Sequence, residues 1–261
     1  MNSFSQAQEI VKKYNQEHLL KFYDNLNEEK KKILINQILE TDFKQLSKLY
    51  SHINDIKDSK DEITPITYID KSKLTNEELE KYMEKGKDVI KNNKYAVITM
   101  AGGQGTRLGH NGPKGTFMLG TTPDKSLFEI FCDKLKKIKE KYNVTIPWYL
   151  MTSKENNLET TKFFEKNNYF NYPKEAIKFF IQDEIPMIDK KGKVILTEDG
   201  LIKQAANGHG GVFESMFKSG IIENIKKKKI EWIFIGPVDN PLVQMTDELM
   251  IGIAVHKDVM G

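Results

Sequence analysis

The pattern of apolar and polar positions changes character near residue 95. Over residues 5–51, apolar side chains recur three or four positions apart, which predicts a small N-terminal helical region. Thr75 and Glu78 then form a capping-box pattern, which predicts a helix that runs to about residue 92. Beyond that point, short apolar runs alternate with helical stretches, as is typical of a parallel sheet with crossover helices.

These runs predict four strands and three helices. The strands are expected at 95–100, 146–151, 176–181 and 231–236, and the helices at about 126–142, 156–168 and 211–227. We therefore predict an α/β fold, a Rossmann-like and mostly parallel sheet with flanking helices. Ligands of such sheets bind beyond the carboxyl ends of the strands, which directs attention to the loops after Met100, Ile181 and Gly236.

The chain is expected to have two parts. Residues 52–74 are polar, include Pro65 and show little periodicity, as in a connecting segment. The expected boundaries are 1–92 for the N-terminal helical extension with its linker, and 93–261 for the α/β domain.

Charge and cysteine content narrow the class of protein. The 40 basic and 37 acidic residues are spread along the chain and leave a formal charge of +3, so no nucleic-acid or membrane partner is expected. No apolar run approaches the roughly 20 residues that cross a bilayer, and the N-terminus does not resemble a signal peptide. A single cysteine, Cys132, excludes an intramolecular disulfide, so a reducing compartment, the cytoplasm, is expected.

The segment from Met100 to Gly115 carries the strongest chemical signal. Five glycines between positions 102 and 112 allow backbone N–H groups to approach an anion closely, as in a phosphate-binding loop. The spacing does not fit a P-loop, because none of the glycines begins the pattern Gly-x4-Gly-Lys-Ser/Thr. It does not fit the dinucleotide-binding fingerprint Gly-x-Gly-x-x-Gly either, because counting from Gly103 the third glycine position is Leu108.

Two cations lie on this loop. Arg107 is the only arginine in the sequence, and Lys114 follows seven residues later. A guanidinium offers a rigid fork of donors that matches phosphate oxygens. Together the two side chains could neutralise a triphosphate and the charge that builds during attack on it.

The loop also carries a family resemblance. The run AGGQGTRLG…PKG resembles the signature of the uridylyltransferases that include UDP-N-acetylglucosamine and UDP-glucose pyrophosphorylases. The likeness continues, in the family's order, through IPWYLMTS, FFIQDEIP, ANGHGGVF and PVDNPLV. QEHLLKFYDNL resembles the N-terminal extension of the eukaryotic-type N-acetylglucosamine enzymes, the group to which the chain looks most similar.

The resemblance implies a reaction and a set of residues. UTP and a sugar 1-phosphate would give a UDP-sugar and pyrophosphate, with Mg²⁺ as cofactor and residues 93–261 as a C-terminally truncated catalytic domain. Arg107 and Lys114 would be catalytic and would hold the triphosphate. The other residues expected to bind UTP are Gly102, Gly103 and Gln182 at the uracil edge, Gly105 and Thr106 in the loop, and Gly208 beside uracil and sugar.

The resemblance also assigns the metal and sugar sides of the site. Asp239 corresponds to the family's magnesium-binding aspartate, and one carboxylate suffices where phosphates and water complete the shell. His209 and Asn240 would lie on the sugar-phosphate side. His209 matches the Gly-His-Gly of the UDP-glucose enzymes, whereas Gly211 matches the N-acetylglucosamine pattern, so either sugar 1-phosphate is compatible with the sequence.

Two alternatives stay open. Family members usually continue well beyond Gly261, so the chain could be a catalytically incomplete UTP- or UDP-sugar-binding fragment, or a short regulatory relative; its ending in HKDVMG favours a fragment. A nucleotidyltransferase for another base would share the glycine loop with its Arg and Lys, although the stretches around Gln182 and Gly208 argue against it.

Overall fold

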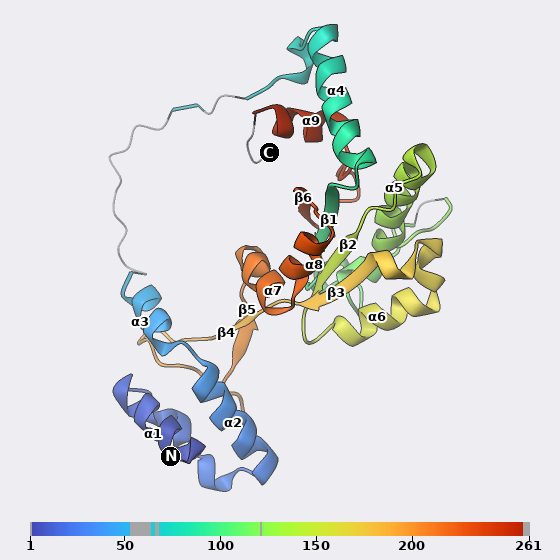
Figure 1. The fold of residues 1–261 in the computed structure, drawn as a ribbon. Coiled ribbons are helices and arrows are strands. Elements are labelled where there is room, and N and C mark those ends of the chain that lie inside the picture. Colours follow the sequence, from blue (N-terminus) through green and yellow to red (C-terminus); the bar gives the residue numbers. More distant parts are fainter. Residues whose placement is uncertain (1, 53–63, 66–67, 121, 258–261) are drawn as a thin grey trace. The chain divides into compact units, whose positions relative to one another are not determined.

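A computed structural model describes residues 2–52, 64–65, 68–120 and 122–257, and the chain divides into two compact units (Figure 1). Unit 1 comprises Met1–Ile66 with Glu184–Asn207, and unit 2 comprises Thr67–Asp183 with Gly208–Gly261. Each unit has its own hydrophobic core. No helix in the described ranges is long and apolar enough to cross a lipid bilayer.

Unit 1 is a helical cluster with a small hairpin. Its elements are α1 (Ser3–Lys13), η1 (Glu17–Leu20), η2 (Tyr23–Asn25), α2 (Glu28–Glu40), α3 (Phe43–His52), and the antiparallel strands β4 (Glu184–Pro186) and β5 (Gln204–Ala206). The helical region predicted at 5–51 is thus confirmed, with short 3₁₀ turns between α1 and α2.

Two glutamines explain why residues 184–207 fold with the N-terminal helices. The Gln16 side chain donates to the Gly192 carbonyl at 3.0 Å and accepts from the Val194 N–H at 2.9 Å. The Gln37 side chain brackets Ile202 in the same way, at 3.2 and 2.9 Å. The compact units therefore do not follow the expected division at residue 92. A division of the chain at a single point cannot place residues 184–207 with the N-terminal helices, although Gln37 binds their backbone from 165 residues earlier.

Unit 2 is an α/β fold built on one parallel sheet in the order β3-β2-β1-β6. Its elements are η3 (Lys71–Lys73), α4 (Asn76–Lys91), β1 (Tyr95–Met100), η4 (Thr106–Leu108), η5 (Lys114–Thr116), α5 (Leu127–Tyr142), β2 (Trp148–Thr152), α6 (Asn157–Lys166), η6 (Asn168–Asn171), η7 (Lys174–Ala176), β3 (Ile177–Ile181), η8 (His209–Gly211), α7 (Val212–Lys218), α8 (Ile221–Lys227), β6 (Trp232–Pro237) and α9 (Glu248–Lys257). The predicted fold class and all four predicted strands are confirmed.

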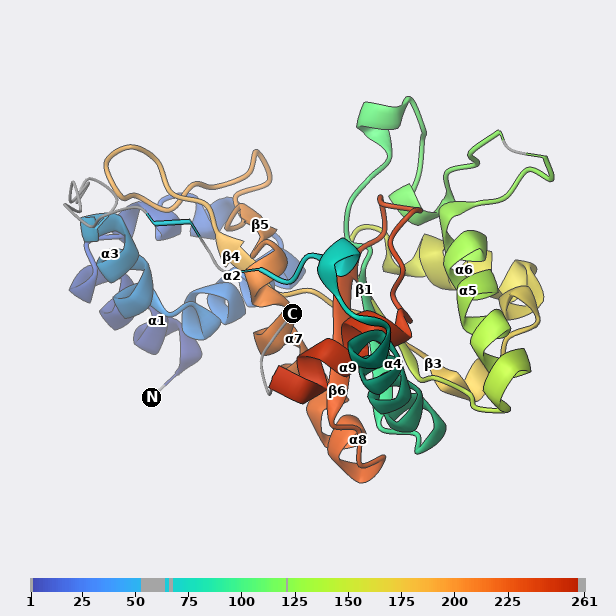
Figure 2. The ribbon, with the colours of Figure 1, turned by 90° about the horizontal axis from the view of Figure 1, so that it is seen from above.

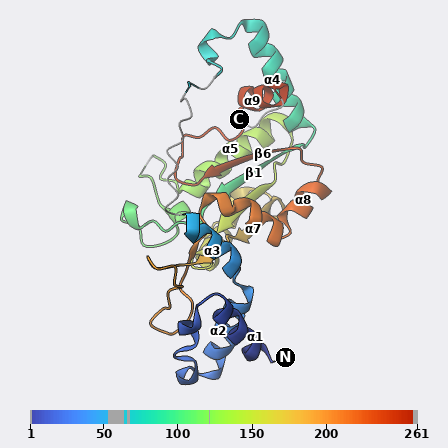
Figure 3. The ribbon, with the colours of Figure 1, turned by 90° about the vertical axis from the view of Figure 1, so that its left-hand side faces the viewer.

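Alternate side chains of the strands are buried in two separate hydrophobic cores, one on each face of the sheet. In β1, Val97 is buried with α5 and α6, whereas Ile98 is buried on the opposite face with α7 and α8. Figure 3 shows α5 on one side of β1 and β6, with α7 and α8 on the other. The sheet is therefore covered on both faces, as its nearly continuous apolar runs predict.

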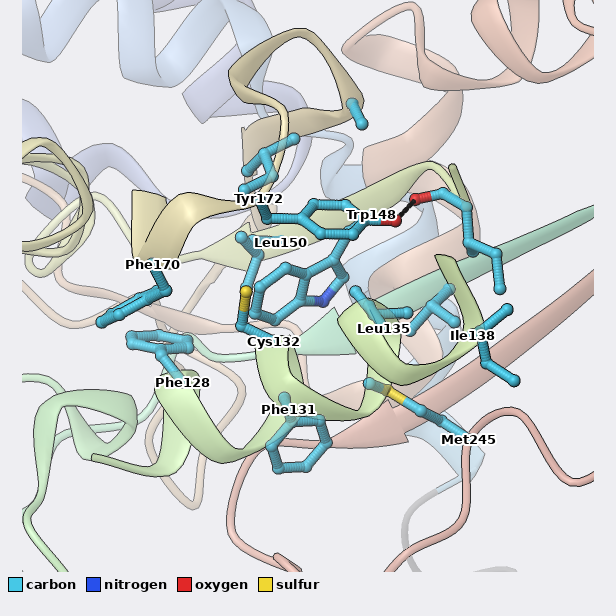
Figure 4. Close-up of a cluster of buried hydrophobic side chains, with 14 of the residues drawn as sticks. Phe128, Phe131, Cys132, Leu135, Ile138, Trp148, Leu150, Phe170, Tyr172 and Met245 are labelled. Atoms are coloured by element: carbon cyan, nitrogen blue, oxygen red, sulfur yellow. Dashed lines mark hydrogen bonds between the residues drawn. The ribbon is translucent and has the colours of Figure 1, made fainter. Parts of the chain in front are cut away.

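The larger core is rich in aromatic side chains (Figure 4). Trp148 is fully buried, and its indole N–H donates to the Thr99 hydroxyl at 2.8 Å. The buried Tyr172 hydroxyl donates to the Ile146 carbonyl at 2.8 Å. Buried polar groups are costly unless they are hydrogen-bonded, so these contacts fix how the rings pack.

One predicted helix start is confirmed, and one predicted helix is divided in two. The capping box at Thr75 and Glu78 forms as predicted and opens α4. The single helix predicted at 211–227 is wrong, because Gly220 with φ of 73° ends α7 before α8 begins. Much of the connecting segment predicted at 52–74 lies outside the described residues.

The first α-helix of unit 2, α4, crosses the last, α9, at very short range (Figure 2). A Cβ atom at Gly86 would lie 1.9 Å from the Glu248 carbonyl oxygen, and one at Gly252 would lie 1.7 Å from the Tyr82 carbonyl oxygen. The two backbones approach this closely only because both positions lack a side chain.

Replacing Gly86 by alanine should therefore destabilise unit 2, although alanine is the better helix former by about 1 kcal/mol. The methyl group would meet backbone, which cannot rotate away, so we expect a net loss of about 2 kcal/mol or more in denaturant unfolding. Gly210→Ala is the matched control, because a Cβ there has nothing within 4 Å. Equal stability of the two variants would contradict the close crossing.

Candidate functional site

The loops that follow β1, β3 and β6 begin in register at the carboxyl edge of the sheet. The N–H groups of Ala101, Gln182 and Val238, each just past its strand, donate to carbonyls of the neighbouring strands at 2.7, 2.7 and 3.1 Å. The parallel ladder therefore continues beyond the strands and aligns the starts of the three loops that the sequence singled out.

The glycine-rich loop folds back on itself. The Gly103 carbonyl accepts from the Lys114 N–H at 3.0 Å, and the Gly105 N–H donates to the Gly112 carbonyl at 2.8 Å. A Cβ atom at Gly103 would lie 3.7 Å from the Lys114 Nζ. The return of the chain thus places the lysine directly against the glycines, which the sequence separation alone did not show.

Three consecutive N–H groups of this loop are available to a ligand. Among the described residues, none accepts a hydrogen bond from the backbone N–H of Gly102, Gly103 or Gln104. Successive free N–H groups form a concave site for a negatively charged or carbonyl oxygen. The loop therefore has the donor arrangement expected of a nucleotide-binding segment.

The Gln182 amide lies against Gly102. A Cβ atom on Gly102 would be 2.7 Å from both the Gln182 amide carbon and the amide nitrogen. A side chain at position 102 would therefore displace this amide, which can offer both a donor and an acceptor. The structure brings together the two residues predicted to face the same base.

Next to the glycine loop, the surface has a hollow of about 290 Å³. Its charged lining consists of Arg107, Lys114 and Asp239, and its apolar lining of Leu108, Phe117, Leu119, Leu127 and Pro241. No described residue forms a hydrogen bond or ion pair with the Arg107 guanidinium. The hollow thus offers an unpaired guanidinium beside an ammonium, as an anionic ligand requires.

Lys114 and Asp239 form an ion pair in this hollow, with Nζ and Oδ2 2.9 Å apart. The lysine side chain is 14% exposed and the aspartate 48% exposed. The hydrogen bond from Lys114 is the main cause that lowers the pKa of the Asp239 carboxyl, with a smaller contribution from His209. Asp239 is therefore ionised at neutral pH, and its other oxygen, Oδ1, remains outside the pair.

The remaining predicted site residues make few contacts with the glycine-rich loop and the hollow. His209 opens η8 and is close enough to Asp239 to influence its pKa. Gly208 has φ of 72°, so the loop needs glycine there, and no atom lies within 4 Å of its Cβ position. Thr106 is exposed in η4. The Asn240 side chain accepts a hydrogen bond from the Leu242 N–H at 3.1 Å and so stabilises a turn of its own segment.

Sequence reasoning missed two residues that hold the loop. His110 donates to or accepts from the Thr116 hydroxyl at 2.7 Å, and its ring packs 2.8 Å from the Cβ position of Gly105. Asn156 is fully buried and donates to the carbonyls of Ala101 and Gly103. His110 lies within the glycine-rich loop, but its residue type and spacing did not indicate that its ring would pack against Gly105. Asn156, the first residue of the helix predicted at about 156–168, has the residue type of an ordinary cap and gives no other signal.

The ion pair leads to a pH prediction. Lys114→Met should raise the pKa of Asp239 toward its ordinary value, measured by NMR titration of the carboxyl carbon. Because the folded-state pKa is lowered, the pair stabilises the protein above the unfolded-state pKa and loses this effect as pH falls through the folded value. Lys141→Met, which removes a lysine paired with Glu248 at 2.6 Å, should leave Asp239 unchanged. Equal pKa values in all three proteins would contradict the pair.

Comparison with known proteins places this geometry in context. The chain is 33% identical, over 95% of its length, to a Schizosaccharomyces pombe protein named "Probable UDP-N-acetylglucosamine pyrophosphorylase", of which it covers 54%. It is 36% identical, over 79% of its length, to the UDP-N-acetylglucosamine pyrophosphorylase of Saccharomyces cerevisiae, of which it covers 44%. The crystal structure of the Trypanosoma brucei UDP-N-acetylglucosamine pyrophosphorylase matches 99% of this chain with a TM-score of 0.81 and 27% identity, and 55% of that chain is covered.

The chain thus spans about half the length of the relatives that it matches. The family model described as UTP–glucose-1-phosphate uridylyltransferase matches residues 39–260, which include the glycine loop, Gln182 and Asp239. On this match, the chain belongs to the UTP–glucose-1-phosphate uridylyltransferase family.

Proposed function

We propose that this chain carries the UTP site of an enzyme that joins UTP to a sugar 1-phosphate, giving a UDP-sugar and pyrophosphate. The observation that carries the proposal is the hollow in which Arg107, Lys114 and Asp239 meet. Family membership supports the reaction class, and the glycine loop beside the hollow supplies the free N–H groups that a nucleotide needs.

In this proposal, the base is bound where Gly102 meets Gln182. Uracil presents carbonyl oxygens and one ring N–H, and the Gln182 amide can pair with both kinds of group. The N–H groups of Gly102 and Gly103 add donors for a carbonyl oxygen. The absence of side chains at these two glycines lets the base lie directly on the backbone.

Arg107 and Lys114 act on the phosphates. An oxygen of the sugar phosphate attacks the α-phosphorus of UTP, the bond from that phosphorus to the oxygen bridging to the β-phosphorus breaks, and pyrophosphate leaves with its charge. The two cations stabilise that charge, while Gly105 and Thr106 hold the loop around it. Catalysis then consists of positioning and electrostatic stabilisation, with no covalent enzyme intermediate.

Asp239 is the residue that would hold Mg²⁺. It is ionised and half-exposed, and Lys114 occupies only Oδ2, which leaves Oδ1 for a cation. No group of three or more His, Cys, Asp or Glu side chains is arranged for a metal within the described residues, so the other ligands would be phosphate oxygens and water, as Mg²⁺ commonly prefers. When bound, the ion neutralises part of the phosphate charge.

For the sugar, we propose N-acetylglucosamine 1-phosphate, with glucose 1-phosphate as the competing substrate. The names of the relatives favour the first, and His209 favours the second. His209 and Asn240 would lie on the sugar-phosphate side. With a single cysteine and no possible internal disulfide, the cytoplasm is the proposed location.

A second candidate is nucleotide binding without turnover. It is favoured by the coverage of the relatives, because the chain matches only about half of their length and the proposed UTP residues lie within that half. UTP binding by calorimetry and pyrophosphate release with each sugar 1-phosphate separate the two candidates. Binding with release supports the enzyme, binding without release supports the second candidate, and neither would contradict both.

Arg107 provides a direct test, because it is the only arginine in the chain. Phenylglyoxal should modify one residue per chain, and UTP should protect it. Arg107→Ala should lower UTP affinity and any turnover by well over tenfold, while Arg107→Lys, which keeps the charge but loses the fork, should fall between. Lys226→Ala, in the last turn of α8, is the control. Normal binding by Arg107→Ala with an unchanged melting temperature would refute the role.

The proposed Mg²⁺ site predicts a coupling between metal and nucleotide. Mg²⁺ should tighten UTP binding to the unmodified protein, and Asp239→Asn should lose most of that gain. In EDTA, the same variant should bind UTP at least as well as the unmodified protein, since the substitution removes a negative charge and frees Lys114. Asp88→Asn, an exposed position on α4, is the control. An equal Mg²⁺-dependent gain in all three proteins would exclude Asp239 as the ligand.

A further inference from the structure

We propose that Asn156 is a positioning residue of the nucleotide loop, and that its side-chain amide turns the N–H groups of Gly102 and Gln104 toward the ligand. The inference rests on the proposed function, because it concerns the same UTP site. It assigns a role to a residue of α6's N-terminal end that contacts no part of the hollow.

The Asn156 side chain is committed to the loop by its hydrogen bonds. Its Nδ2 donates to the Ala101 carbonyl at 3.0 Å and to the Gly103 carbonyl at 3.3 Å. Its Oδ1 accepts from the Ser153 N–H at 2.9 Å, which fixes the orientation of the amide. The residue is 0% exposed, so water cannot replace these contacts.

The Asn156 side chain does not cap its helix, although asparagine at the start of a helix usually does. An N-cap side chain normally accepts from an N–H in the first turn of its helix. Asn156 occupies the N-cap position of α6 but forms no side-chain hydrogen bond with that helix. Its amide is used instead by a loop more than 50 residues earlier.

The planarity of the peptide bond links these carbonyls to the free donors. In a trans peptide, the C=O of one residue and the N–H of the next point in opposite directions. The only cis peptide in the described chain is Thr122–Pro123. Since the carbonyls of Ala101 and Gly103 face Asn156, the N–H groups of Gly102 and Gln104 must face away from it. These are two of the three N–H groups that have no described acceptor.

Asparagine is the residue type that this arrangement needs. One amide nitrogen carries two N–H bonds, one for each carbonyl. The Gly103 carbonyl also accepts from the Lys114 N–H at 3.0 Å, so this carbonyl receives two hydrogen bonds, one from Asn156 and one from the backbone of Lys114. An aspartate of the same size would turn a carboxylate oxygen toward two carbonyl oxygens, and the loop would have to rotate.

The test is calorimetric titration of the full chain with UTP and, separately, with pyrophosphate. Asn156→Asp should lower UTP affinity by about tenfold or more, since both loop hydrogen bonds are lost. Pyrophosphate, whose cations Arg107 and Lys114 are unchanged, should bind as before. Asn156→Ser, which is compatible with the start of a helix but too short to bond both carbonyls, should show the same selective loss if the aspartate variant does not fold.

Asn224→Asp is the matched control. Its Oδ1 accepts from the Tyr149 hydroxyl at 2.8 Å, a contact that a carboxylate keeps, so UTP affinity should be unchanged. If the Asn156 variants bind UTP normally, or lose UTP and pyrophosphate affinity in parallel, the positioning role is wrong and the proposed function stands. If the unmodified chain binds no UTP, the proposed function itself fails.

Discussion

The parallel ladder of β3-β2-β1-β6 is the constraint on which the candidate site depends. All four strands run the same way, so their following loops emerge at one edge. The ladder then continues for one more residue into each of three loops, through Ala101, Gln182 and Val238. A glycine loop, an amide and a carboxylate that are far apart in the sequence therefore begin from fixed and neighbouring positions. Two cores, one on each face of the sheet, keep that register.

The glycine-rich loop is held in place by contacts to its carbonyl groups, on the side opposite its free N–H groups. Asn156 and the Lys114 N–H bind its carbonyls, and the His110 ring packs against Gly105. These contacts use the acceptors of the loop and leave consecutive N–H donors free. Under the proposed function, this arrangement is formed before a nucleotide binds, so binding would need little reorganisation.

The charged side chains of the hollow are only partly paired with one another. Asp239 holds Lys114 in place while Arg107 stays unpaired. In the proposed function, a triphosphate would compete with Asp239 for the lysine, and a cation would compete with the lysine for the carboxylate. The two ligands together would then pair charges that either one alone would leave unpaired.

The sequence by itself determined the α/β class, the four strands, the glycine loop and the family, because apolar periodicity and local spacing are encoded within short segments. It did not determine that residues 184–207 join the N-terminal helices, that α7 and α8 are separate, or that Lys114 pairs with Asp239. Asn156 shows why. Its neighbours in sequence indicate only a helix start, whereas its hydrogen bonds reach residues more than 50 positions away. Contacts of that kind depend on strand order and backbone approach, which only the tertiary structure decides.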